Sequence, residues 1–149
     1  MEHAGRAVVF EDAEGRARRI DDPALDVNAD DILVLRQIGP IGAPGMPGYI
    51  PIPKKLARQG VKDMVRISDG RMSGTAAGTI VLHVTPEAAA GGPLVIVHDG
   101  DRIRLSVAQR TIALGPDDAQ IAERLAGLPP RVAEPLERGY RKLFLQSIT

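Results

Sequence analysis

The stretch Ile67-Ser68-Asp69-Gly70-Arg71-Met72-Ser73-Gly74-Thr75 follows directly on a short apolar run at residues 64–67. The apolar run predicts a strand that ends at Ile67, and Asp69-Gly70 predicts a turn after it. A short helical stretch is then expected to start near Ser73. An acid, a guanidinium, hydroxyl groups and two glycines therefore come together where a strand is expected to end.

Further short apolar or β-branched runs predict strands on both sides of this stretch. They are residues 6–10, 17–20, 32–35, 79–84, 94–97, 103–107 and 110–114. The run at residues 32–35 contains no polar residue, which is typical of a strand buried on both faces. His83 lies inside one of these runs and is expected to be a hydrogen-bonded core or interface residue.

Short helices and one long loop are predicted between the strands. The helices are expected at residues 54–59, 86–90, 117–125 and 136–145. In the third of these, Ile121, Ala122 and Leu125 recur at helical spacing and predict one apolar face. Residues 39–53 are rich in glycine and proline and predict an irregular loop of the kind that is often functional. Many short strands with few helices predict a β-rich α/β domain, with a closed or nearly closed β-barrel and short helices outside it.

Composition limits the classes of function. The 149 residues fit one domain, residues 1–149. Basic and acidic residues both number 19 and aromatic residues make up 3%, so no nucleic-acid partner is expected. No apolar run approaches the roughly 20 residues that span a bilayer, and no signal peptide is recognisable, so a cytoplasmic protein without a membrane partner is expected. Because the chain has no cysteine, it can supply no disulfide, thiolate metal site or iron–sulfur ligand.

The residues after Ile67 allow two interpretations. Backbone N–H groups of Gly74 and Thr75 at a helix start would form an anion cradle, and Arg71 would add a bidentate clamp for a carboxylate or phosphate. Ser73 would lie in that positive field, which favours the alkoxide that a serine needs to act as a base. Alternatively, the segment is a capped strand-to-helix turn in which Asp69 and Ser73 satisfy local amides.

Three segments together resemble a known family. They are residues 67–75, the glycine-rich residues 39–48, and residues 83–93. In this order they are similar to the carboxy-terminal domain of the dihydroxy-acid, phosphogluconate and sugar-acid (aldonate) dehydratase family. Lys54-Lys55-Leu56 and Gly100-Asp101-Arg102-Ile103 also resemble its sugar-acid branch. The resemblance implies a swivelling β/β/α barrel domain similar to the small domain of aconitase-type enzymes.

The resemblance also implies an activity and a role for each site residue. The family removes water from a 2,3-dihydroxy carboxylate to give a 2-keto acid. Ser73 falls on the serine proposed to take the proton alpha to the carboxylate. The substrate-binding residues would be Thr75, Gly74, Arg71 and Asp69, with Asp69 and Arg71 also shaping the loop.

Cofactors are implied for the complete family enzyme, which uses an iron–sulfur cluster and magnesium. The family pattern places a magnesium-binding glutamate after the position of Pro47, but Gly48 follows here and the segment is about two residues short. Glycine offers no side-chain oxygen to a cation that prefers carboxylates. The chain alone is therefore expected to bind no cofactor, and no metal ligand is assigned in it.

The partners follow from what this sequence lacks. The cluster cysteines and the other magnesium ligands belong to the family's larger amino-terminal domain, so a cysteine-bearing large subunit or amino-terminal domain is the expected partner, with a small hydroxy acid as ligand. The alternative is a non-catalytic relic domain that binds a small acid or a partner protein. If nothing docks on the loop, its apolar side chains would favour a homo-oligomer or a bound ligand. These are Ile41, Met46, Tyr49 and Ile50.

Overall fold

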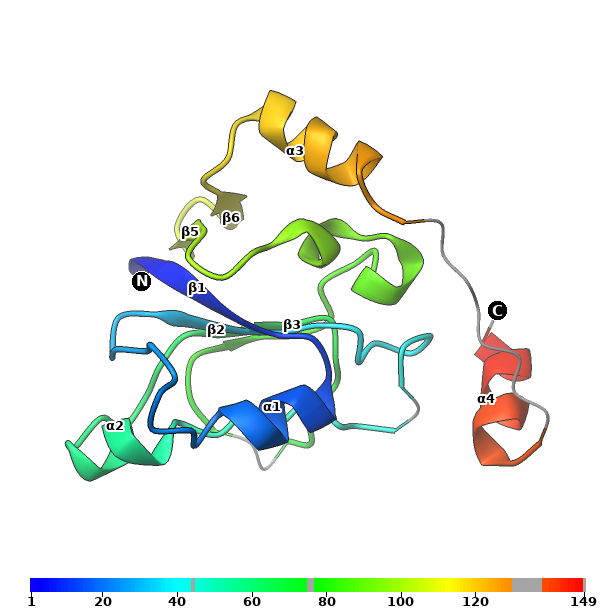
Figure 1. The fold of residues 1–149 in the computed structure, drawn as a ribbon, viewed down its shortest axis with the longest axis horizontal. Helices are drawn as coiled ribbons and strands as arrows, with labels where there is room; N and C mark the ends of the chain where they lie inside the picture. Colours follow the sequence, from blue (N-terminus) through cyan, green and yellow to red (C-terminus); the bar gives the residue numbers. More distant parts are fainter. Residues whose placement is uncertain (44, 75–76, 130–137, 149) are drawn as a thin grey trace.

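One mixed sheet of six strands organises the molecule (Figure 1). The computed structural model describes residues 1–43, 45–74, 77–129 and 138–148. The strands are β1 (Glu2–Phe10), β2 (Ile32–Leu35), β3 (Arg66–Ser68), β4 (Ile80–Val81), β5 (Arg102–Ser106) and β6 (Thr111–Leu114). Their order in the sheet is β4-β3-β2-β1-β5-β6. Strands β1 to β4 run parallel to one another, whereas β5 and β6 are antiparallel to their neighbours.

The sheet is curled but open. Within the described residues, β4 and β6 each pair with one strand only, so they form the two edges of a half-barrel. The predicted β-rich α/β class is confirmed, whereas the described strands do not close into a barrel. The reason is the short β4, where only two residues pair with β3 and the chain then leaves the sheet.

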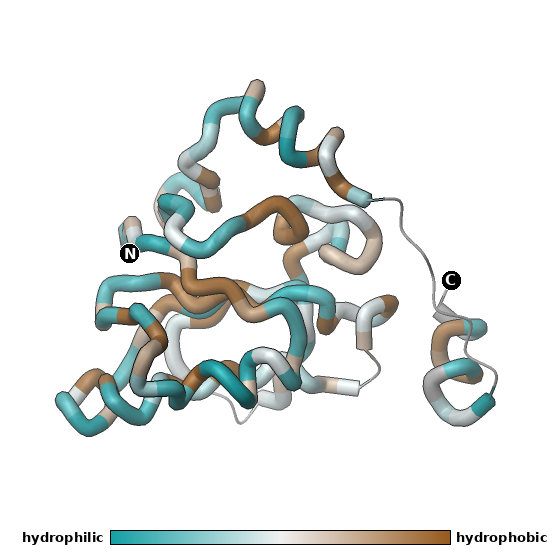
Figure 2. The backbone as a smooth tube through the Cα atoms, in the orientation of Figure 1, coloured by the Kyte–Doolittle hydropathy of each residue, from teal (hydrophilic) through white to brown (hydrophobic). Residues whose placement is uncertain are grey.

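Both faces of the central strands are buried, as the apolar run at residues 32–35 predicted. Successive side chains of a strand point to opposite faces. One core cluster includes Ala7, Val9, Ile32, Val34, Ile67, Ala88 and Leu94. The other includes Val8, Phe10, Leu33, Leu35, Ile20 and Leu56. Figure 2 shows apolar segments in the middle of the molecule, and helices with both hydrophilic and apolar residues around them.

Short helices cover the two faces of the sheet. They are α1 (Ala13–Arg19), α2 (Lys54–Arg58), the 3₁₀ helices η1 (Ala88–Ala90) and η2 (Pro93–Ile96), α3 (Asp118–Ala126) and α4 (Tyr140–Ile148). Helices α1 and α2 lie on one side of the sheet, and the segment that carries η1 and η2 lies on the other (Figure 1). The predicted helix at residues 136–145 falls partly outside the described residues. Among the described residues, no helix is both long and apolar enough to cross a lipid bilayer.

Helix α1 replaces the strand that was predicted at residues 17–20. The Asp12 carboxylate accepts a 2.6 Å hydrogen bond from the backbone N–H of Gly15 and so caps the helix start. The positive charges of the arginines in the last turn interact favourably with the helix dipole and stabilise the helix. Ala17 and Ile20 are three residues apart, a spacing that places them on one side of a helix but on opposite faces of a strand.

Helix η2 replaces the strand that was predicted at residues 94–97. Pro93 begins it, and the ring of proline presets the backbone angle of a helix start. Its carbonyl groups are then taken by a side chain, because Nη1 of Arg36 donates to the carbonyls of Leu94 and Val97 at 2.9 Å each. The guanidinium of Arg36 thus binds backbone carbonyl groups that, in a strand, would accept hydrogen bonds from a neighbouring strand.

The strand predicted at residues 79–84 is shorter than expected. Only Ile80 and Val81 pair with β3. His83 has a φ of 58°, in the left-handed region, and its side chain is exposed. The prediction of a core histidine in a strand is therefore wrong for the described chain, because the backbone turns at this residue and carries the side chain outward. A place for His83 at an interface stays a prediction.

Helix α3 begins as predicted, with a capping box between Asp117 and Gln120. Its apolar face is only partly covered, since Leu125 remains 42% exposed. An ion pair attaches the helix to the sheet, because Arg124 donates to both carboxylate oxygens of Asp101 at 2.5 and 3.0 Å.

Candidate functional site

The parallel strands bring the three family-like segments to one end of the sheet, the one formed by the carboxyl ends of β2, β3 and β4. This end is called the loop edge below. Residues 37–48 follow β2, residues 69–74 follow β3, and residues 83–93 follow β4. Since these strands are parallel, their carboxyl ends lie at the same edge, where open α/β sheets bind ligands. The segments after β2 and β4 lie at the same end of the sheet in Figure 1.

The carboxylate of Asp69 joins these segments. Asp69 is 2% exposed. It accepts hydrogen bonds from the backbone N–H groups of Gln37 at 3.1 Å, Ile38 at 3.2 Å and Ala88 at 2.8 Å. One buried acid therefore sets the relative position of three loops. Its described bonds all go to the protein backbone, so a direct bond from Asp69 to substrate stays a prediction.

Glu87 is a second buried acid at this edge, and it was not among the residues predicted for the site. Its carboxylate accepts hydrogen bonds from the backbone N–H groups of Ile41 at 2.8 Å and Gly42 at 3.2 Å. Gly39 packs against the same carboxylate so closely that a Cβ there would overlap Glu87. The only sign of Glu87 in the sequence is that it is a single acid between Pro86 and a run of alanines. Nothing in this local pattern indicates that its carboxylate binds the loop at residues 41 and 42, about 45 positions earlier.

Arg71 lies half-buried in the loop after β3. Its Nη2 donates to the carbonyl of Ala43 at 3.4 Å, the long end of the hydrogen-bond range. Its Nε is buried and has no hydrogen-bond partner among the described residues. The carbon between the guanidinium nitrogens lies 5.8 Å from the ring centre of Phe144 in α4, a cation–π distance. Arg71 thus retains an unpaired donor at the candidate site.

Ser73 and Gly74 are exposed in the same loop. No helix begins within residues 71–74, so the helix start predicted near Ser73 is not formed in the described chain. A Cβ added at Gly74 would meet open space, which leaves room for a ligand beside the backbone. Thr75 lies outside the described residues, and its predicted contact with substrate stays a prediction, as does the role of Ser73 as base.

Two residues with left-handed backbone flank the turn at Asp69-Gly70. Gln37 has a φ of 60° and His83 a φ of 58°. The backbone N–H of His83 donates to the carbonyl of Gly70 at 3.3 Å, and that of Gln37 donates to Asp69. Residues held in this region cost free energy and cluster at functional sites. The strain therefore lies at the same edge as Ser73 and Arg71.

Among the described residues, the side chains near the candidate site do not fit the magnesium or the iron–sulfur cluster that the resemblance implies. Gly48 packs against Arg71, with its N–H donating to the Arg71 carbonyl at 3.0 Å, and a Cβ at this position would lie 2.5 Å from that oxygen. The carboxylates of Asp69 and Glu87 are already occupied by backbone N–H groups. Among the described residues, no group of three His, Asp or Glu side chains could hold a metal ion, and the sequence has no cysteine for a cluster.

Comparison with known proteins identifies the family. The family described as dihydroxy-acid/6-phosphogluconate dehydratase C-terminal matches residues 1–149. The chain belongs to this family. The resemblance drawn from the three segments is thereby confirmed.

Several curated dehydratases are similar to this domain. The 6-deoxy-6-sulfo-D-gluconate dehydratase of Pseudomonas putida is 52% identical over 149 residues, which cover 99% of this chain and 26% of that protein. The L-arabonate dehydratase of Azospirillum brasilense is 48% identical over 155 residues, covering 99% and 27%. The dihydroxy-acid dehydratase of Pyrococcus abyssi is 37% identical over 146 residues, covering 97% and 26%. The chain thus spans about a quarter of the length of these relatives.

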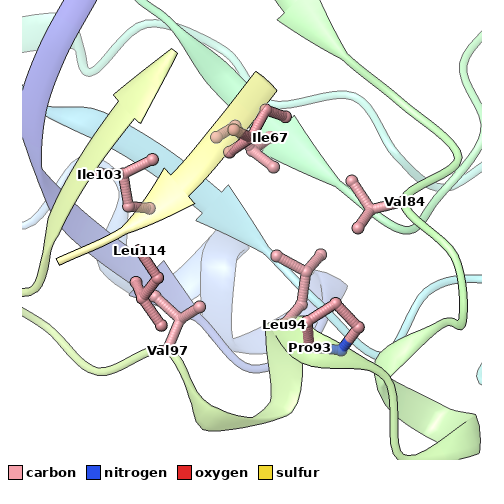
Figure 3. A pocket seen from close by; sticks show the side chains of 8 residues that line it. Ile67, Val84, Pro93, Leu94, Val97, Ile103 and Leu114 are labelled. Carbon is pink, nitrogen blue, oxygen red and sulfur yellow. The ribbon is translucent and has the colours of Figure 1, made fainter. Parts of the chain in front are cut away.

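A separate cavity of about 150 Å³ lies inside the half-barrel of this dehydratase domain (Figure 3). It is lined by Ile67, Val84, Pro93, Leu94, Val97, Ile103, Ile112 and Leu114. All of these side chains are apolar, and a hydroxy acid would lose its hydrogen bonds to water there without replacement. The cavity is therefore part of the packing between the sheet and η2, and the candidate site is the loop edge that carries Ser73.

Proposed function

We propose that this chain forms the carboxy-terminal part of a dehydratase for a sugar acid or a related 2,3-dihydroxy carboxylate. Family membership supports the reaction class, and the names of the relatives at 48–52% identity support a sugar-acid substrate. The observation that carries the proposal is the position of Asp69, whose carboxylate gathers the three loops of the candidate site at one sheet edge.

In the proposed reaction, Oγ of Ser73, as the alkoxide, takes the proton from C2 of the substrate and becomes a hydroxyl. The electron pair of that C–H bond becomes the C2–C3 double bond, while the hydroxyl group on C3 leaves with its bonding electrons and takes a proton from a donor outside this chain to become water. The enol then gains a proton at C3 and loses its O–H proton to solvent, which gives the 2-keto acid. Proton transfer by a positioned side chain contributes about 10²–10⁴-fold to such a step. Arg71 would bind the substrate carboxylate, and the exposed backbone at Gly74 would allow close approach.

The chain requires a second polypeptide segment for this reaction. It has no cysteine for a cluster and no acid at position 48. We therefore assign the iron–sulfur cluster and the magnesium to a cysteine-bearing large subunit or amino-terminal domain. In that assembly the curled half-barrel would act as the swivelling β/β/α domain of aconitase-type enzymes.

A second candidate function rests on Gly48. The close packing of Gly48 on Arg71 leaves no room for the family's acidic side chain. A domain that has lost this ligand would bind a small hydroxy acid, or a partner protein, without catalysis.

Capture of the tagged chain from its native host under anaerobic conditions distinguishes the two functions. The captured material is analysed by mass spectrometry and iron determination, and is assayed with a panel of aldonates for 2-keto acid formation. A stoichiometric, cysteine-containing, iron-bearing partner with turnover supports the dehydratase. Capture of the chain without such a partner and without turnover contradicts it and favours the non-catalytic domain.

A further inference from the structure

The guanidinium of Arg71 has one edge that is nearly unused. Nε and Nη2 lie on the same side of the planar group and together match the two oxygens of a carboxylate. Nε has no hydrogen-bond partner among the described residues, and Nη2 has only the 3.4 Å contact with Ala43. A buried donor that lacks a partner costs free energy, which a bound oxyanion would recover. This edge is therefore the natural receptor for the acid group of a ligand.

Phe144 covers the guanidinium. Its ring centre is 5.8 Å from Arg71, and the ring also lies 6.1 Å from that of Tyr140 on the same helix. Since Nε is buried in this arrangement, a ligand cannot reach it until the covering side chains move. Phe144 is one of the side chains that lie against this guanidinium.

Helix α4 buries little of its described surface against the domain. None of its described side chains is buried, and Tyr140 and Leu143 are 70% and 64% exposed. The helix lies at the periphery, apart from the sheet, in Figure 1. A helix of nine residues has little stability without packing, so little free energy is needed to displace it.

We infer that α4 is a removable cover, in which Phe144 closes the Nε/Nη2 edge of Arg71 until the carboxylate of a hydroxy acid binds there and displaces it. The inference rests on the proposed function, because it concerns the same site. The ligand class is a small hydroxy monocarboxylate, bound through two N–H···O hydrogen bonds. Phe144 thereby becomes a determinant of affinity although it makes no bond to the ligand.

The test compares binding of D-gluconate to the 149-residue chain and its variants by isothermal titration calorimetry. D-glucitol, which lacks the carboxylate, is the control ligand. Phe144→Leu keeps an apolar side chain but removes the ring, and it is expected to bind D-gluconate at least about fivefold more tightly than the unaltered chain. Leu143→Ala, on the same helix, is the matched control and should bind as the unaltered chain does.

A second variant tests whether the gain passes through Arg71. Arg71→Lys keeps the charge but removes the planar fork, and it should abolish the gain when combined with Phe144→Leu. Hydrogen exchange should show faster exchange at residues 140–148 of the unaltered chain when D-gluconate is added. Equal affinity of Phe144→Leu and the unaltered chain, a gain that survives Arg71→Lys, or no binding by any variant would overturn the inference.

These outcomes are separable from the proposed function. Turnover by the captured assembly together with equal affinities would retain the dehydratase and reject the cover. If Phe144→Leu gains affinity through Arg71 but no captured assembly shows turnover, the inference that α4 is a cover is retained and the proposed dehydratase function is rejected.

Discussion

The carboxylate of Asp69 accepts a 2.8 Å hydrogen bond from the backbone N–H of Ala88, which lies 19 residues further along the chain. The same buried group accepts from Gln37 and Ile38, so the loops after β2, β3 and β4 depend on one side chain. A carboxylate is suited to this role because its two oxygens can accept several N–H bonds at once. Asp69 therefore determines the shape of the candidate site through these bonds, whether or not it contacts substrate.

Replacement of Asp69 should destabilise the whole edge. In Asp69→Asn an amide NH₂ replaces one acceptor oxygen and faces backbone N–H groups, so buried donors lose their partner. We expect the free energy of unfolding to fall by about 3 kcal/mol, measured by urea denaturation. Asp30→Asn, at an exposed position, is the control and should change it by less than about 0.5 kcal/mol. Equal effects of the two substitutions would reject the role of Asp69.

A glutamate at position 48 should not restore a metal site. The Cβ of any side chain there would lie 2.5 Å from the Arg71 carbonyl, and the neighbouring acids Asp69 and Glu87 are occupied. We expect Gly48→Glu to lose about 1–3 kcal/mol in the free energy of unfolding and to show no magnesium binding by calorimetry. Gly74→Ala, whose Cβ meets open space, should leave stability unchanged or slightly raised. Magnesium binding by a stable Gly48→Glu variant would contradict this expectation.

Ser73 and Ser68 should respond differently to replacement by alanine. Ser73 is exposed, so Ser73→Ala should change the free energy of unfolding by less than about 0.5 kcal/mol, while turnover of a complete assembly falls by about 10³-fold. Ser68 is buried and its Oγ accepts from the backbone N–H of Gly70 at 2.9 Å. Ser68→Ala should therefore lower stability by about 1 kcal/mol. Near-normal turnover by Ser73→Ala would remove this serine from the mechanism.

The attachment of α3 should depend on pH. Burial raises the pKa of Asp101, but hydrogen bonds from the Arg124 guanidinium and the His98 backbone N–H outweigh it, so the pKa lies below the ordinary value of 3.8. An acid whose pKa is lower in the folded state stabilises the fold fully above its unfolded pKa. That contribution is lost as the pH falls through the folded pKa.

The pH dependence can be measured by urea denaturation at a series of pH values. Below about pH 4, the free energy of unfolding of the unaltered chain should fall more steeply than that of Asp101→Asn. Arg124→Met removes the principal donor and should flatten the same part of the curve. Parallel curves for the unaltered chain and Asp101→Asn would show that this pair does not couple folding to protonation.

Local pattern predicted most elements, and tertiary contacts explain the exceptions. The strands at residues 6–10, 32–35, 103–107 and 110–114 formed because apolar periodicity favours them wherever a neighbour is available. Residues 94–97 have equally strong strand character, but residues 94–96 became part of a 3₁₀ helix and Val97 its C-cap, since Arg36 takes carbonyl groups of this segment. No local pattern in residues 94–97 indicates an arginine some 60 positions earlier.

The candidate site shows the same division. Sequence alone brought Ser73, Arg71 and Asp69 to notice, because polar residues and glycines after a strand are typical of a binding loop. Glu87 was missed, since its function is to accept N–H groups from a loop that is distant in sequence. Phe144 was missed for the same reason, because a phenylalanine in a terminal helix carries no sign of the guanidinium it covers.

By itself, the amino-acid sequence determined which chemistry the chain can contribute. The absence of cysteine excludes cysteine ligation of a cluster by this chain, and the glycine at position 48 excludes a side-chain carboxylate there, because these properties belong to side-chain composition. Only the tertiary structure decided that Asp69 and Glu87 bind backbone rather than a cation, that the sheet stays an open half-barrel, and that Arg71 lies beneath Phe144. Each of these depends on groups far apart in the sequence, whose approach is set by burial and hydrogen-bond satisfaction across the whole domain.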